Sequence, residues 1–80
     1  MTIQLIQGQF NATDALALIT QMIQIKIKFH ENKINGESNE DDIKSRESKI
    51  KRLQKNLHEI RQEIAATGKL VTIHSTIEIE

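Results

Sequence analysis

A run of basic residues is the strongest candidate for chemistry in this 80-residue chain. Six lysines and arginines lie within twelve residues, with Glu47 as the only acid among them: Lys44, Arg46, Lys49, Lys51, Arg52 and Lys55. On a helix, Lys44, Lys51 and Lys55 fall on one side, and such a strip can neutralise phosphates. The sequence therefore offers an anion or nucleic-acid contact at Lys44, Lys51, Arg52 and Lys55. No aromatic residue lies near the strip to stack on a base.

The same residues have a second interpretation, as a solvated helix face. Four acid–base pairs occur at the i, i+4 spacing that stabilises exposed helices: Glu40–Lys44, Asp42–Arg46, Glu47–Lys51 and Lys55–Glu59. Eleven lysines and arginines also balance eleven aspartates and glutamates, so the chain has no overall basic character. We favour the solvated face and keep nucleic-acid binding as the alternative.

Other reactive side chains form no recognisable constellation. The three histidines stand in separate segments, without the i, i+4 spacing of a helical metal site, and we expect each at the surface or its boundary: His30, His58 and His74. The chain has no cysteine, and three glycines are too few for a phosphate-cradling loop. We predict no catalytic, cofactor-binding or metal-ligating residue, and hence no enzyme.

The sequence predicts a strand at each end of the chain. Residues 2–10 carry no charge and fit a strand with Ile3 and Leu5 on one face and Ile6 and Phe10 on the other, Gly8 marking a bulge or a close backbone approach. Residues 69–80 alternate apolar and polar side chains, which is typical of a half-buried strand with one wet face.

The sequence predicts two helices in the middle of the chain. Asn11 can cap a helix over residues 12–34, whose apolar side chains fall in one arc about 200° wide. Asn35-Gly36 ends it, and Ser38 or Asn39 caps a second helix over residues 40–67 that Gly68 closes.

Apolar residues of the second helix repeat every seven positions. They form one narrow seam of the coiled-coil type, which contains a single arginine, Arg46. We expect Leu53 and Leu57 to be buried at its middle. The seam consists of Ile43, Arg46, Ile50, Leu53, Leu57, Ile60, Ile64 and Thr67.

These elements predict one α+β domain over residues 1–80, in the order β-α-α-β: strand 2–10, helix 12–34, loop 35–39, helix 40–67 and strand 69–80. A long antiparallel helix hairpin would lie on a two-stranded antiparallel ribbon. Such a ribbon is marginal in water, the first strand is poorly protected as a free edge, and the arc is wide, so we expect a homodimer or higher symmetric oligomer.

Function and location follow as expectations. The start of the chain lacks the pattern of a signal peptide and no apolar run is long enough to cross a bilayer, so we expect a soluble, cytoplasmic protein with no membrane contact. We predict a small non-catalytic dimerisation or protein-interaction module, with itself and another protein as candidate partners. The alternative is a nucleic-acid-binding regulator that uses the basic half of the second helix.

Overall fold

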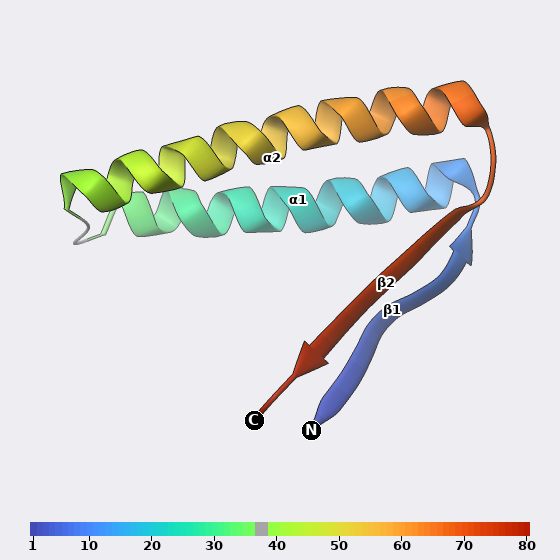
Figure 1. Cartoon of the computed structure of the whole chain (residues 1–80), viewed down its shortest axis with the longest axis horizontal. Helices are drawn as coiled ribbons and strands as arrows, with labels where there is room; N and C mark the ends of the chain where they lie inside the picture. The colour runs from blue at the N-terminus through green and yellow to red at the C-terminus, as the bar shows by residue number, and fades with distance from the viewer. Residues whose placement is uncertain (37–38) are drawn as a thin grey trace.

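The computed structural model has the predicted β-α-α-β order of elements, and it describes residues 1–36 and 39–80. The elements are β1 (Thr2–Phe10), α1 (Ala12–Ile34), α2 (Glu40–Thr67) and β2 (Val71–Glu78) (Figure 1). This confirms the α+β, β-α-α-β fold and the bounds of the first three elements. The last strand is shorter than the predicted range 69–80 at both ends, because its partner strand runs only from Thr2, which pairs with Glu78, to Phe10, which pairs with Val71. Beyond that pair, the Ile79 amide still donates to the Met1 carbonyl at 2.7 Å.

Asparagine side chains begin both helices. Asn11 Oδ1 accepts a hydrogen bond from the Asp14 amide at 2.8 Å, and Asn39 Oδ1 accepts one from the Asp42 amide at the same distance. These bonds satisfy backbone amides that a first helical turn leaves without a carbonyl partner. Asn11 is therefore confirmed as a cap, and Asn39 is a cap of α2. The alternative cap, Ser38, lies outside the described residues.

The helix ends also follow the sequence. α1 ends at Asn35, and α2 ends at Gly68, whose φ of +60° is the left-handed conformation that glycine adopts without strain. Within the described parts of the chain, neither helix is long and apolar enough to cross a membrane.

A bulge in β1 sorts the ribbon into an apolar and a polar face. Phe10 pairs with Val71 and Ile6 with Ser75, but the register then shifts at Leu5, so that Ile3 pairs with Ile77. Because paired residues of antiparallel strands share a face, the extra residue brings Ile3 to the face of Ile6 and Phe10. The expectation that Ile3 lies on the face opposite Ile6 and Phe10 was therefore wrong. The apolar face carries Ile3, Ile6, Phe10, Val71, Ile73 and Ile77, and the other carries Thr2, Gln4, Gln7, Gln9, Thr72, His74, Thr76 and Glu78.

Gly8 has a backbone role, not the predicted bulge or close approach. It pairs in register with Ile73, and a Cβ built on it would meet nothing within 4 Å. Its φ is +136°, a conformation that other residues rarely adopt. Glycine therefore suits this position because of the bend of the strand, and not because another chain segment lies close to it.

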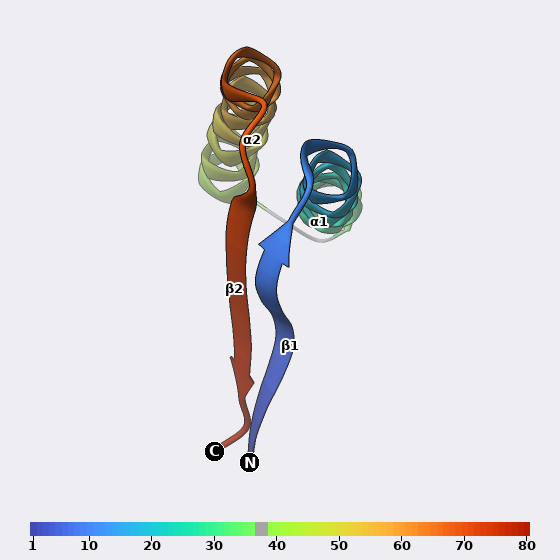
Figure 2. The same ribbon diagram turned by 90° about the vertical axis from the view of Figure 1, so that its right-hand side faces the viewer.

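The hairpin and the ribbon share one end and diverge from it (Figure 1). Viewed end-on, α1 lies at the corner between α2 and the ribbon (Figure 2). The chain measures 43 × 34 × 14 Å, and its radius of gyration of 15.1 Å exceeds the roughly 11.6 Å of a compact chain of this length. The result is a thin V with an open interior angle.

Little of the V is buried. Among the described residues, Ala15, Ile64 and Ile73 are the buried apolar side chains, and all three lie toward the shared end. Leu53 and Leu57 are only half-buried, so the expectation that both are buried was wrong. Figure 2 shows the reason, since α2 has its helical neighbour on one side alone.

We expect Ile64→Ala to lower the free energy of unfolding by about 2–5 kcal/mol, since it empties a buried site. Leu53→Ala should cost less, because its side chain is already half in water. Urea unfolding at one fixed protein concentration measures both, with exposed Gln62→Ala as the control. Equal losses at residues 53 and 64 would contradict this account of the core.

Candidate functional site

The predicted basic strip is an exposed face of α2. Its four candidate contacts all point to solvent: Lys44, Lys51, Arg52 and Lys55. Lys44 Nζ lies 3.5 Å from Glu40 Oε1, and Lys55 Nζ lies 4.0 Å from Glu59 Oε1. Exposed pairs of this kind contribute between zero and about 1 kcal/mol. The structure thus forms two of the predicted pairs on the strip, while Glu47–Lys51 is not among the ion pairs of the described residues.

A small recess joins part of the strip to the first helix. Its volume is about 270 Å³, and it lies between the two helices. Lys26 of α1 meets Lys49 and Arg52 of α2 there, a grouping that the sequence pattern did not indicate. The full lining is Lys26, His30, Lys49, Arg52, Leu53 and Asn56.

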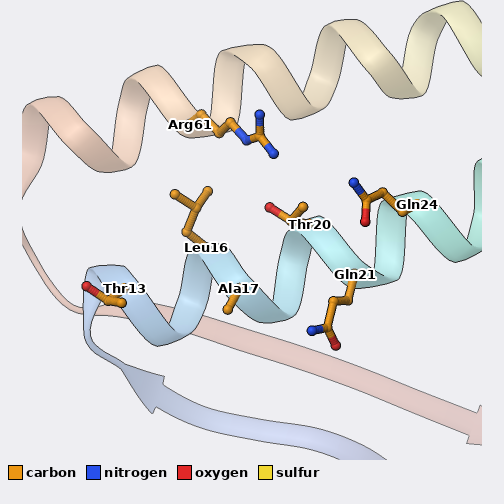
Figure 3. Close-up of a pocket in the computed structure, with 7 residues that line it drawn as sticks. All are labelled: Thr13, Leu16, Ala17, Thr20, Gln21, Gln24 and Arg61. Carbon is orange, nitrogen blue, oxygen red and sulfur yellow. The ribbon is translucent and has the colours of Figure 1, made fainter.

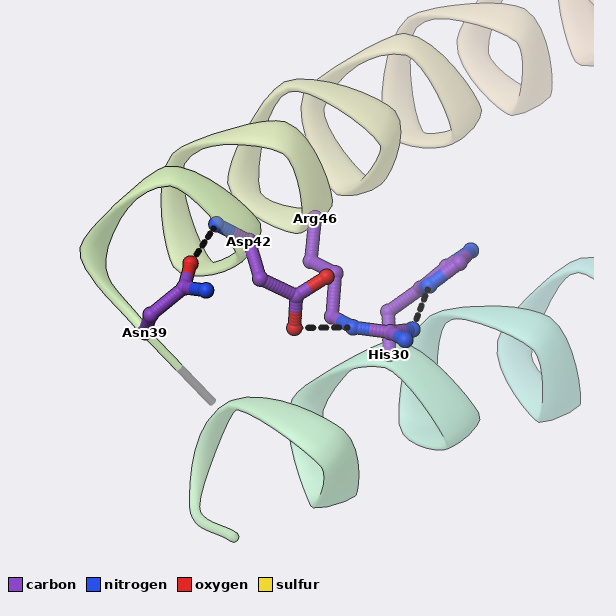
Figure 4. A network of polar contacts seen from close by, with 4 residues as sticks. All are labelled: His30, Asn39, Asp42 and Arg46. Carbon is purple, nitrogen blue, oxygen red and sulfur yellow. Dashed lines mark hydrogen bonds and ion pairs between the residues drawn. The ribbon is translucent and has the colours of Figure 1, made fainter. Parts of the chain in front are cut away.

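The arginine of the apolar seam anchors a polar network at the loop end of the hairpin (Figure 4). Arg46 Nε donates to Asp42 Oδ2 at 3.1 Å, which is one of the predicted i, i+4 pairs. Arg46 Nη1 lies 3.1 Å from His30 Nδ1 across the two helices. His30 is buried, so the expectation of a surface or boundary imidazole was wrong for it.

The geometry fixes the protonation of His30. A guanidinium only donates, so Nδ1 must accept, and the neutral ring carries its proton on Nε2. Burial lowers the pKa of His30 below its usual 6.5, and the positive charges of Arg46, Lys49 and Lys26 lower this pKa further. The ring is therefore neutral at pH 7.

Phe29 extends the network to an exposed aromatic ring on α1. Its ring centroid lies 5.6 Å from that of His30 in an edge-to-face arrangement, and 5.9 Å from Arg46 Cζ. Lys33 Nζ lies 5.6 Å from the same centroid. The distances of the two cations from the Phe29 ring suit cation–π attraction, which favours the placement of Arg46 beside it.

Two signals in the sequence point to this network. An arginine inside an apolar seam needs a partner, because a half-buried charge is costly when unpaired. His30 in turn falls within the apolar arc of its own helix when the positions are spaced at 100°. The sequence pattern places the arginine in the seam, but its pairing with a histidine sixteen positions away depends on how the two helices pack.

An open groove runs between the helices on a different side of α1 (Figure 3). It has a volume of about 540 Å³ and offers hydroxyl, amide and methyl groups with one guanidinium, that of Arg61. Leu16 and Thr20 point toward α2, while Gln21 points away from it (Figure 3). No carboxylate or imidazole lines it, so the groove holds no acid–base pair.

The remaining histidines are kept apart by the fold. His58 lies on α2 and His74 on the polar face of the ribbon. Among the described residues, no three histidine or acidic side chains gather where they could hold a metal ion.

Comparison with known proteins adds no relative. The chain matches no protein-family model, no curated protein and no solved structure. The described residues offer a partly buried polar network, a basic recess and an open groove of mixed lining.

We expect stability to fall as pH drops below about 6.5, because the unfolded histidine then takes up a proton that the folded His30 resists. His30→Gln keeps an acceptor for Arg46 but does not titrate, so it should flatten the change between pH 7.5 and 5.5. Urea midpoints at the two pH values test this. The exposed His58→Gln is the matched control, and an unchanged pH dependence in His30→Gln would refute the assignment.

Proposed function

We propose that this chain is a small non-catalytic module that acts by self-association, as a homodimer or higher symmetric oligomer. The observation that carries the proposal is the amount of surface left open. The accessible area is 6327 Å², against about 4,900 Å² for a compact monomer of this mass. An excess of about 1,400 Å² is large for a chain of 80 residues.

The size of the core supports the same proposal. Four described residues are buried, and one of them is the polar His30. A lone two-stranded ribbon is marginal in water, and chains this short rarely draw more than about 3–5 kcal/mol from one core. With no cysteine for a disulfide, a second chain is the available source of further burial.

Light scattering at micromolar concentration tests self-association. We expect a mass near 18 kDa or a higher multiple, against 9.2 kDa for one chain. A symmetric contact needs only one self-complementary surface, so a dimer is the simplest outcome. A mass near 9 kDa that persists as the concentration rises would rule the proposal out.

Nucleic-acid binding is the second candidate, and the recess between the helices favours it. Lys26 of α1 adds a cation to Lys49 and Arg52 of α2, so positive charge spans both helices at that point. The strip itself remains open to solvent. The balanced net charge and the ion pairs along α2 weigh against a strong interaction.

Salt dependence separates the two candidates. A strip that binds duplex DNA should lose affinity with a log–log slope of about −0.9 per phosphate, and charge reversal at Lys44, Lys51 and Lys55 should abolish binding. We expect only weak, non-specific retention at physiological salt in a filter or polarisation assay. Tight retention of one duplex sequence would place the nucleic-acid function first.

A further inference from the structure

We propose that a second copy of this chain covers the apolar interior of the V, between α1 and the ribbon. This inference rests on the proposed self-association and adds where it takes place. We call this region the wedge surface. It consists of Leu18, Met22, Ile25 and Phe29 on α1 and of Ile3, Ile6, Ile73 and Ile77 on the ribbon.

The α1 side of the wedge surface is a continuous apolar stripe. Its members follow Ala15 at alternating spacings of three and four residues, which keeps them on one side of a helix. Ala15 is fully buried, close to the shared end of the V. Ile25, nearly three turns further on, is 70% exposed, and Phe29 is also exposed.

The ribbon side shows the same gradient. Ile73 is 8% exposed, Ile77 41% and Ile79 57%, so exposure grows along β2 away from the shared end. Both strands contact α1, so the burial of Ile73 indicates that the apolar face of the ribbon is turned toward that helix. The two arms therefore present apolar surfaces that meet at the vertex and separate beyond it (Figure 1).

The open area suits a second copy. A standard interface removes about 800 Å² from each partner, and obligate homodimers remove more. The excess of about 1,400 Å² on this chain is in that range. A two-fold contact also sets the same apolar surface against itself, which needs no complementary partner.

The polarity of the other surfaces points to a closed contact. The paired residues on the opposite face of the ribbon are all polar. The groove between the helices has a mixed lining, in which Leu16 and Ala17 stand beside threonine, glutamine and arginine side chains (Figure 3). A single self-complementary apolar surface per chain gives a closed two-fold dimer, whereas a filament needs two different interaction surfaces on each chain. Among the described residues, six of the eight large exposed apolar side chains lie on the wedge surface or at the tip of the ribbon: Met1, Ile3, Ile25, Phe29, Ile77 and Ile79. The other two are Leu5, at the bulge of β1, and Leu70, just before β2.

Ile25→Glu tests whether the wedge surface is the site of self-association. The control is Gln24→Glu, at the neighbouring residue that lines the open groove between the helices. Each substitution occurs twice in a symmetric dimer, and truncation of a central apolar contact costs at least about 30-fold in affinity. We expect the dissociation constant from sedimentation to rise on the order of 100-fold or more for Ile25→Glu and to stay within about threefold for Gln24→Glu. Ile25 is exposed in the single chain, so the variant should keep its helical circular dichroism spectrum.

Protection of a thiol gives a second readout that does not depend on that variant. The chain has no cysteine, so Ile25→Cys and Gln24→Cys each carry a single reactive group. Alkylation of Ile25→Cys should slow as the protein concentration rises through the dissociation constant, while Gln24→Cys should react at a constant rate.

The outcomes separate the two proposals. A chain that stays monomeric at all concentrations overturns both. If the chain dimerises but the two Glu variants have similar dissociation constants, and the two Cys variants similar protection, self-association stands. The wedge surface is then not the site of the contact. Capture of a lipid vesicle or of another protein by an otherwise monomeric chain also overturns the choice of a second copy.

Discussion

The fold depends on α1, whose single apolar arc contacts both α2 and the ribbon. α1 lies at the corner between α2 and the ribbon, so its apolar side chains must face two directions (Figure 2). Leu16 points toward α2 (Figure 3), and His30 bonds Arg46 of α2. The stripe from Ala15 to Phe29 lies on an adjoining side of the helix, and its first residue is buried at the end that α1 shares with the ribbon. The arc of about 200° that the sequence predicts is wide because it covers both contacts. The ribbon diverges before the second contact is complete, which leaves the outer half of the stripe exposed.

Different interactions hold the two ends of the hairpin: apolar burial at one end and polar bonds at the other. Near the ribbon, Ala15, Ile64 and Ile73 exclude water. At the loop end, the contact is polar and directional, since Arg46 bonds Asp42 on its own helix and His30 on the other. A partly buried charged network adds little net stability but penalises any register that leaves it unpaired. We therefore regard the network as what fixes how the helices align, and burial near the ribbon as what holds them together.

Local signals explain how much of this architecture could be predicted. Asn11 and Gly68 each act within a few residues of their own position, so helix ends are readable from short patterns. The faces of β1 were not readable, because one unpaired residue at Leu5 moves Ile3 to the other side of the ribbon. Likewise, the partner of Arg46 lies sixteen positions away on another helix, and only the packing of the hairpin brings them together.

The two candidate functions use different sides of the molecule. On α2, the helical spacing places Lys44, Lys51 and Lys55 opposite the seam that packs on α1. The wedge surface lies beyond α1, on the ribbon side. A dimer formed there leaves the basic strip of each copy in solvent, and two-fold symmetry then presents two strips at a fixed separation. Because avidity rises when two weak sites are held together, strips that bind little as single chains gain affinity for an extended polyanion once the dimer forms. Any anion binding by this chain should therefore depend on self-association, whereas self-association has no need of the strip.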